Sequence, residues 1–559
     1  MFDLKNIKDQ KEVILLREEE EEELAKILSV KYGVLYINLK TVSINTDALR
    51  IIPEKKSREL KIIGFGKVGN KIKIALISPK DVDVQNYLKE LEEKGFSLSI
   101  YMVSHKSLEK GWIRYDEISY TTKTTAGMVD ISSENVTNLL DETKTIPKAQ
   151  EVFKEILKST QQHKVSRFFE AIIAASLSTK ASDIHIEPEK DLITLRFRLD
   201  GVLAVVTKFD HKVNKLLLSR IKLISGMKLN IISKPQDGRL TIQLPEKAVQ
   251  IRVSALPGTY GESIVMRLLD PDSISVKIED LGIEKHLFQI LTREINRPNG
   301  MILNTGPTGS GKTTSLYTFL KKIHTPENKI ITIENPIEYH LPGIVQTQIN
   351  LNKGYTFLEG LKSSLRQDPD VIMVGEIRDA ETAKIAVNSA LTGHLVFSTL
   401  HTNDAAGTFY RLIDLGIQPK IISTAVNIVL AQRLVRKPCE FCKKEIVLEG
   451  KDKEIISKIT SEIDNLNTYT ENTEKMFISV GCPKCNNTGY KGRLGIYEAI
   501  LVDADTSKLL EENPGKAAIK EVFKRQGILS LSQDGIIKVL TGNTTLSEIR
   551  RVIDLEEDM

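Results

Sequence analysis

The amino-acid sequence predicts an α/β protein of several domains, centred on a nucleotide-binding domain with a mostly parallel sheet. Its 559 residues suggest about three to five domains. Between residues 276 and 437, apolar segments of strand length alternate with helical segments, as in a parallel sheet covered by helices on both faces. Within this region, a glycine-rich loop joins the strand segment Met301–Leu303 to the helical segment Thr314–His324. A loop in that position indicates a phosphate-binding site.

Changes in composition and periodicity divide the chain into six segments. The first contains an alternating strand, Lys71–Ser78, and a helical stretch, Val84–Glu93. In the third, Arg196 and Arg198 lie on one face of a strand, and Asp200-Gly201 predicts a hairpin turn after them. We expect an N-terminal domain at 1–116, a polar linker at 117–148, a second N-terminal domain at 149–275, the nucleotide-binding domain at 276–437, a cysteine-bearing segment at 438–500 and a region of short helices at 501–559.

The bulk composition excludes several classes of protein. Hydrophobic residues make up 41% and charged residues 27%, which is ordinary for a globular protein. A formal net charge of +4 provides no strong basic field, so we expect no direct nucleic-acid partner. The apolar runs, such as Val371–Val374, are far shorter than the roughly 18 residues of a membrane span. Met1–Asp9 has no apolar stretch of a signal peptide, so we expect a cytoplasmic protein.

The glycine-rich loop has the sequence GPTGSGKT and matches G-x-x-x-x-G-K-[ST] between a strand and a helix. Its glycines let backbone N–H groups turn towards phosphates, and the helix N-terminus adds positive partial charge. Lys312 is expected to reach the β- and γ-phosphates of ATP, and the Thr313 hydroxyl to bind Mg²⁺. The candidate nucleotide-binding residues are Gly306, Pro307, Thr308, Gly309, Ser310, Gly311, Lys312, Thr313 and Thr314.

Two glutamates follow predicted strands of the same sheet. Lys329–Ile333 leads to Glu338 a few residues further on, and Val371–Val374 leads to Glu376. Carboxylates at the carboxyl ends of parallel strands face the ligand crevice, which suits a group that orients water. Gly375 stands where many P-loop enzymes have Asp, so we expect Glu376 to act on the magnesium shell through water.

Two histidines flank the apolar strand segment Leu395–Leu400. His394 precedes this segment and His401 follows it. A regular strand would place them on opposite faces, with one near the γ-phosphate and one structural. Of the two, we assign His401 to the catalytic set.

The cysteines form two CxxC pairs, Cys439/Cys442 and Cys482/Cys485, separated by 39 residues. Two such knuckles offer four thiolates to one ion, and an all-sulfur site with no open position favours structural Zn²⁺. An iron–sulfur cluster and disulfide pairing are the chemical alternatives. We expect the spacer 446–480 to be a polar insert without a core of its own.

Motifs along most of the chain resemble those of the ATPases that power type II secretion and type IV pilus assembly. The motor motifs are GPTGSGKTT (306–314), IENPIEY (333–339), LRQDPDVIMVGEIRD (365–379) and TGHLVFSTLHTND (392–404). The upstream motifs are ASDIHIEP (181–188), RFRLDG (196–201), QDGRL (236–240) and LPGTYGESIVMRLL (256–269). The downstream motifs are CEFC (439–442) and CPKCNNTGYKGRLGIYE (482–498). The resemblance covers roughly residues 150–559.

The resemblance implies a homohexameric ATPase. Its RecA-like P-loop motor domain would follow two small α/β N-terminal domains and carry a tetracysteine metal insert and a helical C-terminal tail. By the same resemblance, Glu338 is the catalytic carboxylate and Glu376 the Walker B acid. Arg252 and Arg267 would reach the γ-phosphate, and Arg239 is a weaker candidate. The expected partner is the inner-membrane platform protein of a pilus or secretion machine, bound through the N-terminal domains at the inner face of the cytoplasmic membrane.

Some features depart from the family pattern, and they leave other functions to be weighed. Asn335 replaces an Asp that often precedes the proline of its motif. The Arg-Leu-Gly element of members that bind cyclic di-GMP is absent, so that ligand is not predicted.

A RecA-like nucleic-acid translocase would need a basic, aromatic-bearing pore. A non-hydrolysing scaffold would not need the full set of P-loop and acidic residues. Retraction ATPases usually lack the extra N-terminal domain and the cysteine segment, so assembly is favoured.

Overall fold

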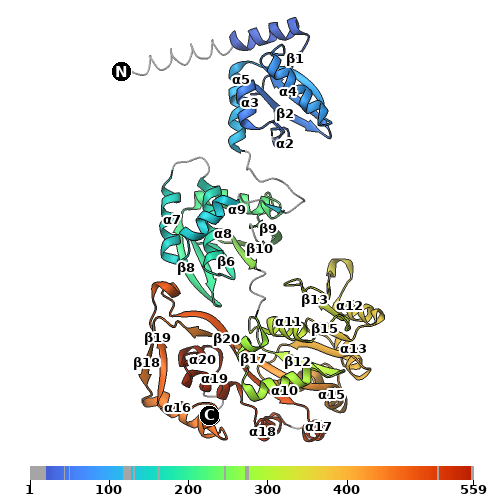
Figure 1. Cartoon of the computed structure of the whole chain (residues 1–559), viewed down its shortest axis with the longest axis vertical. Helices are drawn as coiled ribbons and strands as arrows, with labels where there is room; N and C mark the ends of the chain where they lie inside the picture. Colours follow the sequence, from blue (N-terminus) through green and yellow to red (C-terminus); the bar gives the residue numbers. More distant parts are fainter. Residues whose placement is uncertain are drawn as a thin grey trace. The chain divides into compact units, whose positions relative to one another are not determined.

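The computed structural model describes residues 20–42, 44–49, 51–117, 128–129, 133–159, 164–244, 247–270, 276–512 and 515–555. The chain divides into two compact units, Met1–Thr122 and Lys123–Met559 (Figure 1). The expected border near residue 275 and much of the expected linker, residues 118–127 and 130–132, lie outside the described residues.

The first unit contains a four-stranded sheet in the order β1-β4-β3-β2. The predicted strand and helix of this region are confirmed as β3 and α4, which begins where the Asp81 side chain accepts the backbone N–H groups of Asp83 and Val84. Trp112 donates its indole N–H to the Ser57 hydroxyl at 3.0 Å in the core. The elements are β1 (Leu35–Tyr36), α2 (Thr46–Leu49), α3 (Glu54–Leu60), β2 (Ile62–Val68), β3 (Lys71–Leu76), α4 (Val82–Glu93), β4 (Ser97–Met102), α5 (His105–Trp112) and the 3-10 helix η1 (Ile113–Glu117).

A seven-stranded sheet opens the second unit, in the order β5-β9-β10-β11-β6-β7-β8. The hairpin predicted at Asp200-Gly201 is confirmed, because Leu199 pairs with Val202 and both turn residues have positive φ. The strands are β5 (Met128–Val129), β6 (Asp183–Pro188), β7 (Ile193–Leu199), β8 (Val202–Phe209), β9 (Gln236–Gln243), β10 (Ala248–Gly258) and β11 (Gly261–Leu269). The helices are α6 (Ser133–Glu142), α7 (Ile146–Lys158), α8 (Lys164–Ser178) and α9 (His211–Ile224).

The segment expected to be a linker contains helical structure in its second half. Helix α6 and the first residues of α7 lie within 133–148, and Leu139 and Ile146 are buried in the core of the sheet. The sequence did not predict α6 because its few apolar residues are interspersed with Ser, Asn, Thr and Asp. Among the described residues, an extended linker therefore ends before Ser133.

A second seven-stranded sheet follows, in the order β14-β13-β15-β16-β12-β17-β20. Every neighbouring pair is parallel except β17 and β20 at one edge. Strand β20 lies in the segment that we expected to be separate, yet it pairs with most of β17. The strands are β12 (Gly300–Thr305), β13 (Ile330–Glu334), β14 (Val345–Gln348), β15 (Val371–Val374), β16 (Leu395–Leu400), β17 (Val426–Pro438) and β20 (Tyr490–Leu501).

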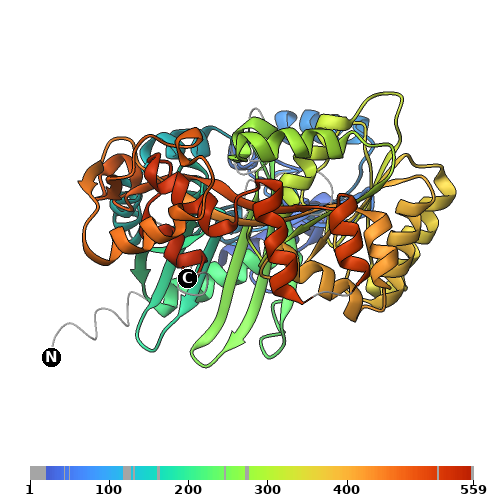
Figure 2. The ribbon, with the colours of Figure 1, turned by 90° about the horizontal axis from the view of Figure 1, so that it is seen from below.

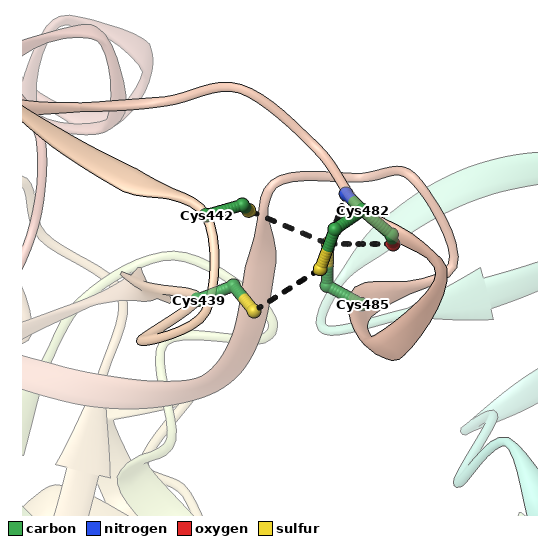
Figure 3. A group of neighbouring side chains, drawn as sticks. All are labelled: Cys439, Cys442, Cys482 and Cys485. Carbon is green, nitrogen blue, oxygen red and sulfur yellow. Dashed lines mark hydrogen bonds between the residues drawn. The ribbon is translucent and has the colours of Figure 1, made fainter.

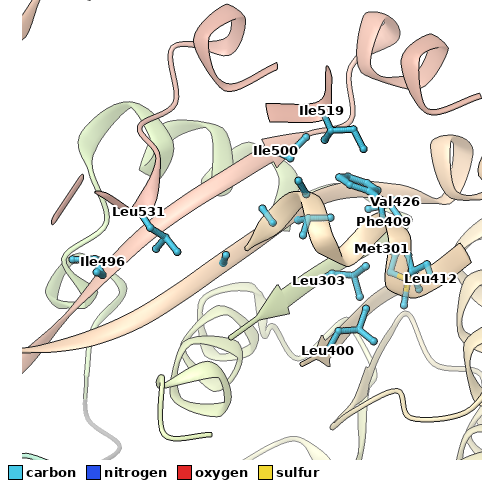
Figure 4. Packing of buried hydrophobic residues seen from close by; sticks show 14 of the residues in the cluster. Met301, Leu303, Leu400, Phe409, Leu412, Val426, Ile496, Ile500, Ile519 and Leu531 are labelled. Atoms are coloured by element: carbon cyan, nitrogen blue, oxygen red, sulfur yellow. The ribbon is translucent and has the colours of Figure 1, made fainter. Parts of the chain in front are cut away.

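Helices cover both faces of this sheet because alternate strand residues point to opposite sides (Figure 2). Ile302 packs with residues of α10 (Lys285–Ile295) and α11 (Lys312–Ile323). Met301 and Leu303 pack on the other side, against the larger core drawn in Figure 4. The helices contributing to that core include α12 (Phe357–Ser364), α13 (Ala380–Leu391), α14 (Ala405–Asp414), α15 (Pro419–Ala425), α18 (Lys516–Gln526), α19 (Leu531–Leu540) and α20 (Leu546–Val552).

The residues between the two cysteine pairs form a short antiparallel ribbon and a helix. Strand β18 (Lys443–Val447) pairs with β19 (Lys475–Ser479), and α16 (Gly450–Ser461) lies between them in the sequence. The spacer 446–480 was expected to be a polar insert without a core of its own. Ile456 and Ile459 of α16 are buried in the same core as the motor sheet, so the insert shares that core. In the described part of the chain, the helices fall short of the length and apolarity that a bilayer span requires.

Candidate functional site

The glycine-rich loop lies where β12 ends and α11 begins, at the carboxyl edge of the parallel strands. Three of its glycines, Gly306, Gly309 and Gly311, have φ values of 145°, 82° and 92°, which side chains rarely tolerate. Gly311 is the N-cap of α11, so the loop opens directly onto a helix N-terminus. The Ser310 hydroxyl is buried and has no hydrogen-bond partner among the described residues. An orphaned donor within a loop of this shape suits a phosphate oxygen.

Lys312 folds back over the loop that it ends. Its Nζ donates to the carbonyl oxygens of Gly306 at 2.6 Å and Pro307 at 3.1 Å. Burial lowers the pKa of Lys312 to about 8, although the nearby Glu376 carboxylate acts in the opposite direction. The following residues, Thr313 and Thr314, are half-buried in the first turn of α11. The structure thus holds an ammonium group at the mouth of the loop, where an anion would stabilise its charge.

Glu334, which the sequence reasoning passed over, ends β13 as a buried carboxylate. It accepts hydrogen bonds from the hydroxyls of Tyr317 and Thr332, and from the Gln346 amide at 3.1 Å. Burial raises its pKa above the ordinary value, against the effect of these donors. Its acceptor positions are occupied from several sides, so Glu334 ties the end of β13 to α11 and β14.

Glu338 lies four residues further along and is paired with an arginine of the preceding sheet. Arg252 Nη1 is 3.1 Å from Glu338 Oε2, and its Nη2 donates to the Ile337 carbonyl at 2.6 Å. The two side chains are 23% and 29% exposed, so solvent reaches the pair from one side. This contact joins two candidates that the sequence placed in different domains.

The three candidate arginines stand side by side on neighbouring strands. Arg252 on β10 is the register partner of Arg239 on β9 and of Arg267 on β11. Register partners project from the same face of a sheet, so these side chains form one row. Arg267 pairs with Asp183, with Nε 2.9 Å from Oδ1, and this hydrogen bond raises its pKa. Arg252 therefore contacts the motor loop, whereas Arg267 is held within its own sheet.

Glu376 follows β15 and lies close to His401, another residue of the predicted catalytic set, and to Arg378. Its Oε2 lies 3.5 Å from His401 Nε2, and its Oε1 lies 2.8 Å from Arg378 Nη2. Because Glu376 also acts on the charge of Lys312, these groups share the carboxyl edge of the sheet. His394 lies at the opposite edge, where its backbone carbonyl accepts from Gly300 at the start of β12. Of the two histidines, only His401 lies beside the loop.

The four cysteines form a compact cluster at the ends of two strands (Figure 3). The Sγ–Sγ distances are 3.9 Å for Cys439–Cys482, 3.8 Å for Cys442–Cys485 and 3.7 Å for Cys482–Cys485. A tetrahedral ion with metal–sulfur bonds of about 2.3 Å has sulfur–sulfur edges of about 3.8 Å. The cluster therefore has the dimensions of a mononuclear metal site.

Backbone donors at the second knuckle also suit a thiolate. Cys485 Sγ accepts from the N–H groups of Cys482 at 3.2 Å and Gly489 at 3.3 Å. Burial alone would raise the pKa of the Cys485 thiol, but these donors, together with the side chains of Cys482 and Cys442, lower it to about 7. Such donors stabilise a neutral thiol only weakly, whereas they stabilise the negative charge of a metal-bound thiolate.

The strand–loop–helix unit, its lysine and the acids at neighbouring strand ends define a P-loop ATPase. Residues 158–551 match the family described as Type II/IV secretion system protein. The chain is 36% identical over 531 residues to the Type IV pilus assembly ATPase PilB of Myxococcus xanthus (strain DK1622), an alignment covering 95% of this chain and 91% of that one. It is 43% identical over 401 residues to the Type II secretion system ATPase E of Vibrio cholerae serotype O1, covering 71% and 77%.

A solved structure agrees with the fold. The X-ray structure of the Yersinia pseudotuberculosis ATPase DotB aligns with a TM-score of 0.51 at 20% identity, covering 69% of this chain and 93% of that one. At that identity the likeness concerns the fold alone. The match over residues 158–551 and the relatives above show that the chain belongs to the Type II/IV secretion system protein family.

Proposed function

We propose that this chain is the homohexameric motor that couples ATP hydrolysis to assembly of a type IV pilus. The observation that carries the proposal is the contact between Arg252 of the second N-terminal sheet and Glu338 beside the P-loop. It supports a site shared by two domains, in which movement of one domain changes the chemistry in the other.

The residues at the carboxyl edge of the motor sheet would have different roles in hydrolysis. Lys312 and the loop N–H groups would bind the β- and γ-phosphates, and Thr313 would hold Mg²⁺, which neutralises charge on the phosphates. Glu338 would orient the attacking water, for which a carboxylate in the loop after β13 is suited. Glu376 and His401 would act on the magnesium shell and the γ-phosphate from the next strands.

The arginine row completes the site from the other sheet. In the structure Arg252 donates to Glu338 and to the Ile337 carbonyl. When a γ-phosphate is present, its charge competes with Glu338 for the same guanidinium. Transfer of Arg252 to the phosphate would free the Glu338 carboxylate for water and stabilise charge on the transferred group. Arg267 and Arg239 would support this step from the neighbouring strands.

The cysteine cluster would hold one Zn²⁺ through Cys439, Cys442, Cys482 and Cys485. Its sulfur–sulfur distances of 3.7 to 3.9 Å fit one tetrahedral ion, and they are too short for the corners of a multi-iron cluster. The cluster joins the end of β17 to the start of β20, so the metal would stabilise the edge of the motor sheet. It lies outside the nucleotide loop, so its role is structural.

The kind of apparatus that the motor drives is proposed from the relatives. The alignment with the pilus assembly ATPase covers 95% of this chain, whereas that with the secretion ATPase covers 71%. That coverage supports pilus assembly, while the higher identity of the secretion relative keeps pseudopilus assembly as the second candidate. The chain would act in the cytoplasm, at the inner face of the membrane, bound to the platform protein through its N-terminal domains 1–116 and 149–275.

A replacement of the chromosomal gene tests this role. Lys312→Ala should abolish surface pili and leave the level of the protein unchanged, since it removes charge from the loop without altering the core. If pili persist and a secreted protein is lost instead, the pseudopilus is the correct machine. If both persist, the proposed motor role is wrong.

A further inference from the structure

One buried polar side chain contacts both flanks of the P-loop without belonging to its motif. Gln432 lies on β17, one residue beyond the Ala431–Thr305 pair with which the contact between β12 and β17 ends. Strand β17 continues past that point and runs beneath the loop. Gln432 is 1% exposed, so its amide has to find partners within the protein.

The partners of Gln432 come from either side of the loop. Its Oε1 accepts from Asn304 Nδ2 at 3.0 Å, at the end of β12, and from Ser315 Oγ at 2.9 Å, in the first turn of α11. Both donors are fully buried. One carbonyl oxygen thus fixes the distance between the strand that enters the loop and the helix that leaves it.

The loop glycines are also shaped around this residue. A Cβ at Gly306 would lie 2.5 Å from the Gln432 backbone oxygen, and a Cβ at Gly311 would lie 2.8 Å from its Nε2. Both distances are closer than carbon tolerates. Gly306 and Gly311 therefore allow the loop to close over Gln432, in addition to any approach of phosphate.

A second set of contacts extends the arrangement away from the loop. Gln432 Nε2 donates to the Tyr497 hydroxyl at 3.3 Å, and that hydroxyl donates to the Leu281 carbonyl at 3.3 Å. The next residue, Arg433, donates from Nη1 to the Gln432 carbonyl at 3.1 Å and from Nη2 to Asn403 at 2.6 Å. The loop is thereby connected to the segment that follows His401 and to the start of the motor domain.

We propose that Gln432 is a positioning residue that holds the P-loop in its phosphate-binding shape through Asn304, Ser315 and Tyr497. It does not touch the nucleotide, and its effect is transmitted by the loop backbone. Loss of its amide leaves the loop free to relax, so the N–H groups no longer converge on the phosphates. This inference rests on the nucleotide binding proposed above.

The test compares Gln432→Met with Gln526→Met in the full-length protein. Methionine keeps the length of glutamine and removes both hydrogen-bonding atoms. Gln526 is the matched control because it bridges α18 to Leu501 of β20, and Leu501 pairs with Ile428 near the other end of β17. Titration with mant-ADP and Mg²⁺ gives the Kd, and thermal unfolding without nucleotide gives the general loss of stability.

The Kd of Gln432→Met should rise about tenfold, which corresponds to about 1.4 kcal/mol, while Gln526→Met stays within twofold of the wild type. Equal Kd values for folded Gln432→Met and wild type would overturn the inference, as would an equal loss in Gln526→Met. If Gln432→Met does not fold, Tyr497→Phe decides. It should raise the Kd severalfold, and an unchanged Kd counts against the proposal. A wild-type chain that does not bind mant-ADP would instead refute the proposed function itself.

Discussion

Replacement of Arg252 by alanine should distinguish its role from that of Arg267, although the sequence analysis assigned both arginines the same role. In the structure Arg252 provides a 3.1 Å bond to Glu338 and a 2.6 Å bond to the Ile337 carbonyl, whereas Arg267 bonds to Asp183. At 3.1 Å and an effective dielectric constant of about 20, the gross attraction of the Arg252–Glu338 pair is about 5 kcal/mol. Desolvation and solvent screening reduce the net value to about 1 kcal/mol, because both side chains are partly exposed.

A net attraction of about 1 kcal/mol would be weak enough for a γ-phosphate to displace Glu338, as the proposed exchange of Arg252 requires. Arginines that stabilise phosphoryl transfer contribute about 10³-fold or more to kcat. We therefore expect Arg252→Ala to lower kcat at least about 100-fold and to raise the Kd for ADP less than threefold. Arg267 is bonded to Asp183 and acts on Glu338 only through its charge, so Arg267→Ala should lower kcat less than tenfold.

The assay is steady-state phosphate release from the purified protein, with mant-ADP binding measured on the same samples. Circular dichroism and size-exclusion chromatography control for folding and assembly. The reasoning is refuted if Arg252→Ala keeps a kcat within threefold of the wild type, or if Arg267→Ala has the larger effect at equal assembly.

Two further predictions concern the metal and the loop lysine. Elemental analysis should find one zinc per chain in a colourless protein, and Cys482→Ser should lose the metal while the Kd for ADP stays within twofold; visible absorbance or a metal-free native chain would exclude the zinc site. Burial lowers the pKa of Lys312 to about 8, so most Lys312 side chains in the free enzyme are uncharged at pH 8.5. Binding of a phosphate favours the charged form and should therefore be accompanied by uptake of a proton. Calorimetry in two buffers of different ionisation enthalpy should show uptake at pH 8.5 and almost none at pH 7, where Lys312 is charged throughout; equal uptake at both pH values would contradict the assignment.

Local patterns in the sequence were sufficient for the P-loop and the cysteine pairs. The loop motif carries its own context of strand and helix, and the sequence spacing within each CxxC pair already gives a knuckle. The short apolar runs also predict the strands β13 and β15, which precede Glu338 and Glu376. What these patterns predict is local, because each depends on residues close together in the chain.

Contacts between distant segments were not predictable in the same way. Gln432 follows the P-loop by more than a hundred residues and sits in an apolar strand, where an isolated glutamine gives no signal. The pairing of β20 with β17 joins segments that are separated in the sequence by both cysteine pairs and the insert between them, so no local pattern predicts it. The row formed by Arg239, Arg252 and Arg267 depends on strand register, which periodicity alone does not fix.

The central claim is that this chain hydrolyses ATP at the P-loop with Glu338 as the water-orienting group. The most direct measurement is phosphate release and ATP retention by purified wild type, Lys312→Ala and Glu338→Gln under the same conditions. We expect the wild type to turn over, Lys312→Ala to bind no nucleotide, and Glu338→Gln to retain ATP with turnover reduced at least about 100-fold. Wild-type turnover by Glu338→Gln would contradict the assignment of the carboxylate, and turnover by Lys312→Ala would contradict the site itself.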